Sequence, residues 1–105
     1  TGGPASGRGR EGFSRFAAAK HGLGAVAQSM ARELGPEGIH VAHVVVDGGI
    51  DGVFIRQMRP NAEDLLAEGA ILRPEEIAQS YVALHRQGRS AWTHALDVRP
   101  WKESW

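Results

Sequence analysis

The sequence of 105 residues contains no cysteine, which excludes disulfides, thiolate nucleophiles and cysteine-based zinc sites. It also has no net charge, because 12 lysines and arginines balance 12 aspartates and glutamates, so a nucleic-acid partner is not expected. No apolar run approaches the ~20 residues that a membrane span requires. No basic stretch followed by an apolar segment opens the chain, as it would in a secretory signal. We therefore expect a cytoplasmic protein that has no membrane or nucleic-acid partner.

Glycine, in contrast, is abundant, with 14 residues, and several of these lie in residues 1–12. This segment has no apolar periodicity and is predicted to be a flexible glycine-rich loop. Gly7, Gly9 and Gly12 formally match the dinucleotide-binding spacing Gly-x-Gly-x-x-Gly. That motif functions between a strand and a helix, and residues 1–6 do not have the pattern of a strand. A flexible loop is therefore the better interpretation.

The rest of the chain alternates between helical and strand patterns. Apolar residues at helical spacing predict a long helix over residues 13–34, which Gly35-Pro36 ends. Residues 39–46 are rich in valine and isoleucine and predict a strand buried on both faces, as in a parallel sheet. The other predicted elements are short helices at 50–59 and 61–69, a helix at 74–86 and a strand at 94–98, with Asn61 as a helix cap and Pro74 in a first turn.

This order predicts one domain, residues 1–105, of the α/β class with parallel strands. Two strands make a poor sheet by themselves, so we expect the chain to associate with copies of itself. Aromatic residues make up only 7% of the chain, yet Trp92, Trp101 and Trp105 gather near its end. Tryptophan is enriched at protein interfaces, which favours a subunit contact there over packing on the last helix.

Four segments together resemble the short-chain dehydrogenase/reductase family. They are FAAAK at residues 16–20, LGAVAQSMARELGPEGIHVAHVVVDGGID at 23–51, RPEEIAQSYVALHRQ at 73–87 and SAWTHALDVRPW at 90–101. They resemble the C-terminal portion of such enzymes, in the same order. The resemblance implies a partial Rossmann-like fold, the C-terminal half of a doubly wound parallel sheet. It also implies NAD(P)-dependent oxidation and reduction of alcohols and carbonyls, on a small-molecule substrate that the sequence does not identify.

The resemblance also implies roles for individual residues. Lys20 stands at the family's lysine, which binds the nicotinamide ribose and lowers the pKa of a catalytic tyrosine. Phe16 stands at the position of that tyrosine, and Gly3 stands where the family places its serine. A phenyl ring has no proton to transfer, so the standard mechanism is expected to be impaired.

The family's cofactor contacts continue after the buried strand, in a Pro-Gly motif. Asp47 replaces the proline here, and Gly52 stands at the position of a phosphate-contacting threonine. Gly48 and Ile50 are therefore the expected nicotinamide contacts, together with Lys20. The family's N-terminal strand, glycine loop and helix, which bind the dinucleotide, are not among these 105 residues. NAD or NADP is thus implied by resemblance, and this chain by itself is expected to bind neither.

Two other functions remain open from the residues. One is a non-catalytic oligomerisation module. The other is a small cofactor-independent enzyme, such as a hydrolase that uses Ser6 or Ser14 in a cleft between copies. Asp47 and Asp51 could pair for acid–base chemistry, although a capped turn is the simpler explanation. A metal site is not expected, because His40 and His43 point to opposite faces of a strand. His43 is predicted to be partly buried and hydrogen-bonded.

Overall fold

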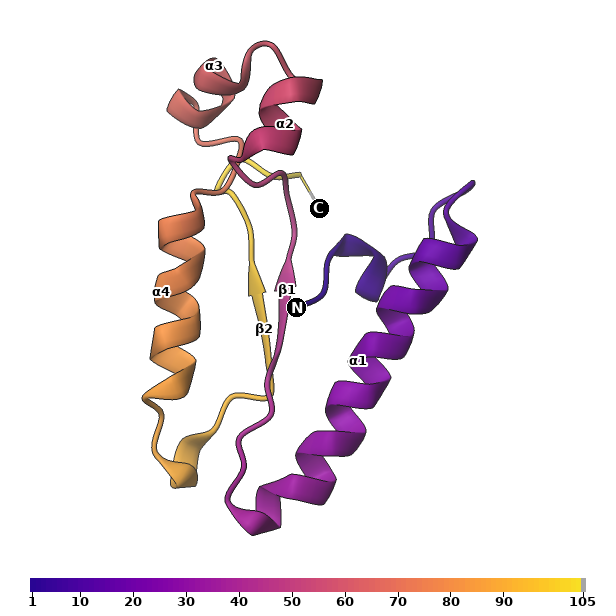
Figure 1. Ribbon diagram of the computed structural model, residues 1–105, viewed down its shortest axis with the longest axis vertical. Helices are drawn as coiled ribbons and strands as arrows, with labels where there is room; N and C mark the ends of the chain where they lie inside the picture. The colour runs from indigo at the N-terminus through magenta and orange to yellow at the C-terminus, as the bar shows by residue number, and fades with distance from the viewer. Residues whose placement is uncertain (105) are drawn as a thin grey trace.

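The computed structural model describes residues 1–104, and it shows a short parallel sheet between two helices (Figure 1). The sheet consists of β1 (His43–Val46) and β2 (Ala95–Val98), with α1 (Ser14–Leu34) on one face and α4 (Pro74–His85) on the other. Two short helices, α2 (Val53–Met58) and α3 (Ala62–Ala67), lie beyond the carboxyl end of β1. Three 3-10 turns complete the described elements, at Pro4–Ser6, Gly35–Glu37 and Arg89–Ala91. The predicted α/β class is confirmed.

The long helix ends where the sequence predicted. After Leu34 the chain turns through Gly35–Glu37, and Gly38 has a φ of 82°, a left-handed conformation that glycine adopts without steric cost. Pro74 occupies the first turn of α4 as expected, and Glu75 and Glu76 follow near the positive end of that helix. Asn61 precedes α3 but its side chain makes no capping hydrogen bond, so its predicted capping role is wrong.

The first strand is shorter than the apolar run predicted. The ladder pairs His43 with Ala95 and Val46 with Val98, so β1 begins only where its partner begins. Residues 39–42 remain outside the ladder, because β2 supplies no residues opposite them. Burial follows the prediction in part, since Val44 and Val46 are buried and Val45 is half-buried.

The opening segment differs from the predicted loop at its start. Gly2 forms a parallel bridge to Val45 on the edge of β1 opposite β2, donating to the carbonyl of Val44 at 2.7 Å and accepting from Val46 at 3.2 Å. A 3-10 turn, Pro4–Ser6, follows. The open edge of β1 thus orders a glycine segment that has no strand pattern of its own.

The core lies between the sheet and α4. Val44, Val46, Leu72 and Leu84 form a buried cluster, against which Ala42, Ile77, Leu96 and Val98 pack. On the other face, Ala17 is the one buried residue of α1. No helix within residues 1–104 has the length and apolar character needed to cross a lipid bilayer.

Candidate active site

The residues expected to carry catalysis lie on the first turns of α1. Phe16 is half exposed, and the ammonium nitrogen of Lys20 lies 5.8 Å from the centroid of its ring. This is the geometry of a cation–π contact, which a phenyl ring forms through its negative face. The ring has no hydroxyl, so the pair can hold a positive charge but cannot donate a proton from position 16.

Gly3 lies at the end of the segment that bridges to β1. Its backbone is extended, and its N–H donates to Oγ of Ser6 at 3.1 Å. A Cβ placed on Gly3 would meet only the carbonyl oxygen of Val46, at 3.8 Å. The structure therefore has room for a side chain at this position, although the sequence supplies none.

Asp47 directly follows β1 and is 5% exposed. Its N–H donates to the carbonyl of Val98 at 2.9 Å, which extends the parallel ladder and which a proline at this position would not do. Its carboxylate contacts the guanidinium groups of Arg8, at 3.3 Å, and Arg99, at 3.4 Å. A buried carboxylate is stable when it is paired in this way, so Asp47 ties the opening segment to the residue after β2.

The residues after Asp47 include the two expected nicotinamide contacts, Gly48 and Ile50. Gly48 has a φ of 150°, and a Cβ on it would lie 2.7 Å from Cδ of Pro100 and 3.3 Å from Cδ1 of Leu72. Its lack of a side chain therefore serves the packing of the chain itself. Ile50 forms a parallel bridge with Leu72 and is 43% exposed.

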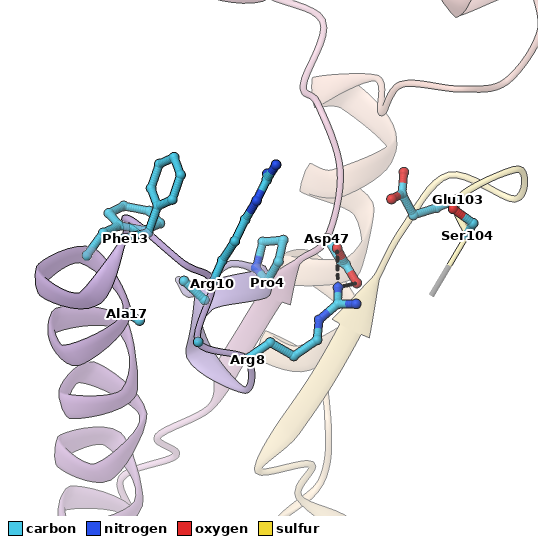
Figure 2. A pocket seen from close by; sticks show the side chains of 11 residues that line it. Pro4, Arg8, Arg10, Phe13, Ala17, Asp47, Glu103 and Ser104 are labelled. Atoms are coloured by element: carbon cyan, nitrogen blue, oxygen red, sulfur yellow. Dashed lines mark hydrogen bonds and ion pairs between the residues drawn. The ribbon is translucent and has the colours of Figure 1, made fainter.

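A cavity of about 540 Å³ lies between the start of α1 and the carboxyl end of β1 (Figure 2). Phe16 and Ala17 of α1 line it together with Phe13, the residue before the helix. Arg8 and Asp47 line it across from them, joined as an ion pair. The structure thus brings Phe16 and Asp47 to one cavity. Lys20, Gly48 and Ile50 are not among its lining residues.

No family model and no curated protein sequence matches the chain. Among solved structures, a short-chain dehydrogenase from Rhodopseudomonas palustris matches with 43% sequence identity and a TM-score of 0.65. The match covers 95% of this chain and 36% of that chain. The chain is therefore similar to a short-chain dehydrogenase over about a third of that protein's length. It is consistent with the C-terminal portion of the family's fold, as the sequence motifs predicted.

Within this chain, Asp47 and Asp51 are not an acid–base pair. Asp47 binds Arg8 and Arg99, whereas the carboxylate of Asp51 binds Nε of Arg56 at 2.7 Å. The hydrogen bond from Arg56 holds the pKa of Asp51 below its ordinary value. Each carboxylate is therefore paired with its own guanidinium partners and not with the other carboxylate. Sequence reasoning missed Arg8, whose only signal is that it is a cation inside a glycine-rich segment.

The histidines are placed differently from one another. The ring of His40 stacks on Trp92 with centroids 4.8 Å apart, and its Nε2 bonds to the carbonyl of Thr93 at 2.7 Å. His43 is buried as predicted, but its Nε2 has no hydrogen-bond partner, so the prediction that it is hydrogen-bonded is wrong at that atom. Within residues 1–104, no three histidine, aspartate or glutamate side chains are grouped so that they could bind one metal ion.

The sequence left open whether the tryptophans lie at a subunit contact or pack within their own chain, and the structure places Trp92 and Trp101 differently. Trp92 packs on its own chain, through His40. Trp101 is 79% exposed, while the edge of its ring occupies the space where Gly69 would carry a Cβ. Trp105 lies outside the described residues. An interface role thus remains a prediction that concerns Trp101.

Proposed function

We propose that the chain comes from a lineage of NAD(P)-dependent oxidoreductases acting on carbonyls and alcohols, and that its standard proton transfer is impaired. The observation that carries this proposal is the contact between Lys20 and Phe16. A lysine at this place supports a tyrosine hydroxyl in the family, whereas here its ammonium lies over a phenyl ring. The charge that would lower a hydroxyl pKa has no hydroxyl to act on.

The residues of this chain fit the nicotinamide half of a dinucleotide in part. When bound, NAD or NADP would accept or supply the hydride. Lys20 would hold the ribose, and the exposed side of Ile50 would provide an apolar surface for the ring. Gly48 fits less well, because Pro100 and Leu72 occupy its open side. These contacts reach only one half of a dinucleotide, so we expect the 105 residues alone to have no measurable affinity for it.

The proton donors are the weakest part of the site. In the family, a tyrosine hydroxyl and a serine hydroxyl meet the carbonyl oxygen of the substrate. Position 16 offers a phenyl ring and position 3 offers only backbone. General acid catalysis contributes typically ~10²–10⁴-fold to such reactions, so the loss of these hydroxyls removes a large share of the rate.

The test distinguishes activity lost through the missing hydroxyls from activity lost through the absence of the dinucleotide-binding half. The variant Phe16→Tyr of the 105-residue chain is expected not to oxidise NADPH with any carbonyl, as followed by absorbance. A fusion of the N-terminal part of the R. palustris dehydrogenase to this chain is expected to bind NAD(P)H by calorimetry without turnover. In that fusion, Phe16→Tyr combined with Gly3→Ser is expected to raise turnover by about 10²-fold or more.

The matched control is Phe13→Tyr, which adds the same hydroxyl at the residue before the same helix, where the ring contacts Arg10 and not Lys20. It is expected to leave the fusion inactive. Turnover by Phe16→Tyr in the isolated chain would refute the proposal, since the cofactor-binding half would then be dispensable. Equal turnover from Phe13→Tyr and Phe16→Tyr would show that position 16 is not the donor position.

We also propose that the chain is cytoplasmic and forms a homo-oligomer through α1. The exposed large apolar residues of this helix and its cap are Phe13, Phe16, Leu23, Val26 and Met30. An apolar surface of this extent is typical of an interaction site. The same surface supports the non-catalytic module as the second candidate function, since assembly requires none of the catalytic hydroxyls.

A further inference from the structure

His43 is enclosed on both sides by glycines. A Cβ on Gly24 of α1 would lie 3.3 Å from Cε1 of its ring, and a Cβ on Gly2 would overlap its Nε2. The residue is 9% exposed, and Nε2 is the one buried side-chain nitrogen or oxygen in residues 1–104 without a hydrogen-bond partner. Leaving such an atom unpaired costs free energy, because it has given up its hydrogen bond to water. A ligand or a reacting group that bonds to Nε2 would recover that cost.

Ser6 places a hydroxyl beside this nitrogen. The same Cβ on Gly2 that would overlap Nε2 of His43 would also overlap Oγ of Ser6, so the two atoms are near neighbours across the glycine. Oγ accepts the N–H of Gly3 at 3.1 Å. This bond uses a lone pair of Oγ and leaves the hydroxyl hydrogen available for a second acceptor. Nε2 of His43 is the nearby atom that lacks a donor.

The imidazole has the protonation state that a base requires. Burial away from water lowers the pKa of His43, the amino terminus, His94 and Lys20 lower it further, and Asp97 opposes them. The ring is therefore neutral near pH 7, with a lone pair on one nitrogen. Nucleophile–base pairs are often more widely spaced without substrate and tighten when substrate binds.

Ser6 and His43 line one cavity of about 430 Å³. Pro4 and Val45 give it apolar surface, and Arg8 adds a guanidinium that is paired with Asp47; Asp97 and Arg99 also line it. A small acyl group fits such apolar walls, and a cation stabilises the negative charge that develops on an acyl oxygen during attack. Phe16 and Lys20 are not among its lining residues, although it shares Pro4, Arg8 and Asp47 with the cavity beside Phe16.

We propose that Ser6 and His43 form a nucleophile–base pair that accepts an acyl group from small carboxylic esters. Oγ of Ser6 forms a bond to the acyl carbon while its proton passes to Nε2 of His43. The bond from that carbon to the alkoxy group then breaks, and the alkoxide leaves with the proton from His43. Water releases the acid from Ser6 by the same steps, which restores the hydroxyl.

The test uses the 105-residue chain with 4-nitrophenyl acetate and no nucleotide. We expect a burst of nitrophenolate and an acetyl group on Ser6, located by mass spectrometry of peptides. His43→Gln is expected to slow the burst by about 10-fold or more, and Ser6→Ala to abolish it. The matched controls Ser14→Ala and His21→Gln keep the wild-type rate. Acetylation only of the amino terminus or lysines, or a burst unchanged in His43→Gln, would overturn the proposal.

A second measurement covers the case in which His43→Gln does not fold, as judged by circular dichroism. Iodoacetamide should alkylate the thiol of Ser6→Cys about 10-fold faster than that of Ser14→Cys at pH 7, because the neutral imidazole accepts the thiol proton. Equal rates for the two thiols would overturn the proposal. Neither assay involves NAD(P)H or Phe16, so its outcome is independent of the oxidoreductase proposal.

Discussion

The helices α4 and α1 flank the same two strands (Figure 1), but their side chains are buried against the sheet to different extents. From α4, Leu84 belongs to the buried cluster around Val44, and the half-buried Ile77 packs against it. From the 21 residues of α1, only Ala17 is buried. The sheet and α4 thus enclose the core of the chain, although Tyr81 and Val82 of α4 stay exposed, whereas the α1 layer keeps a longer apolar face that nothing in residues 1–104 covers.

This contrast separates the side of the sheet that stabilises the fold from the side that carries the candidate sites. Hydrophobic stabilisation scales with the apolar area removed from water, so the free energy of unfolding depends mainly on the α4 side. The cavity with Phe16, and the ring of His43 against Gly24, both lie on the α1 side. Changes on that side are expected to alter association and chemistry more than folding.

The largest expected effect is at Leu84. Leu84→Ala removes a side chain from the buried cluster and leaves a cavity, which lowers the free energy of unfolding by about 2–5 kcal/mol. Leu23→Ala makes the same change on α1, where the side chain is 39% exposed, and is expected to cost less than about 1 kcal/mol. Urea unfolding of both variants at low protein concentration measures the difference. Equal losses would mean that the two faces are packed alike.

A smaller effect is expected from charge on the α1 face. Val26 is 56% exposed, and Val26→Glu would place a carboxylate in the proposed contact between copies. Burying an unpaired charge is unfavourable, so the variant is expected to dissociate to monomers while its helix content stays the same. Light scattering coupled to gel filtration gives the mass of each form.

The control for this experiment is Val53→Glu on α2, where the side chain is 75% exposed on a different part of the molecule. It is expected to keep the wild-type mass. A wild-type chain that stays monomeric at high micromolar concentration would contradict self-association. Dissociation by Val53→Glu but not by Val26→Glu would move the contact from α1 to α2.

The sequence predicted the elements whose signals are local. The apolar spacing of α1, its stop at Gly35-Pro36 and the position of Pro74 depend only on neighbouring residues. The start of β1 depends on where β2 begins, which is far along the chain. The apolar run at residues 39–46 therefore predicted a strand that is longer than the one observed. The bridge of Gly2 to Val45 is likewise a contact between residues far apart in the sequence. Glycine has no side chain, so the sequence pattern at Gly2 does not predict a strand pairing there.

The candidate site was predictable to the same extent. Phe16 and Lys20 form a motif within one helix turn, so the sequence shows their relation directly. The ion pair of Arg8 with Asp47 joins residues far apart in the chain, and only the fold brings them to one cavity. The unpartnered nitrogen of His43 depends on Gly2 and Gly24 together, and therefore could not be anticipated from either segment.

The smallest expected effect is a dependence of stability on pH through His43. The pKa of its ring is lowered in the folded chain from an ordinary value of 6.5. The unfolded state therefore binds more protons below pH 6.5, and the free energy of unfolding falls as the pH decreases from 6.5 towards the folded pKa. His43→Gln should remove this slope, whereas His21→Gln, on the surface of α1, should keep it. Urea midpoints between pH 7.5 and 5 measure both, and a slope that persists in His43→Gln would assign the effect to another group.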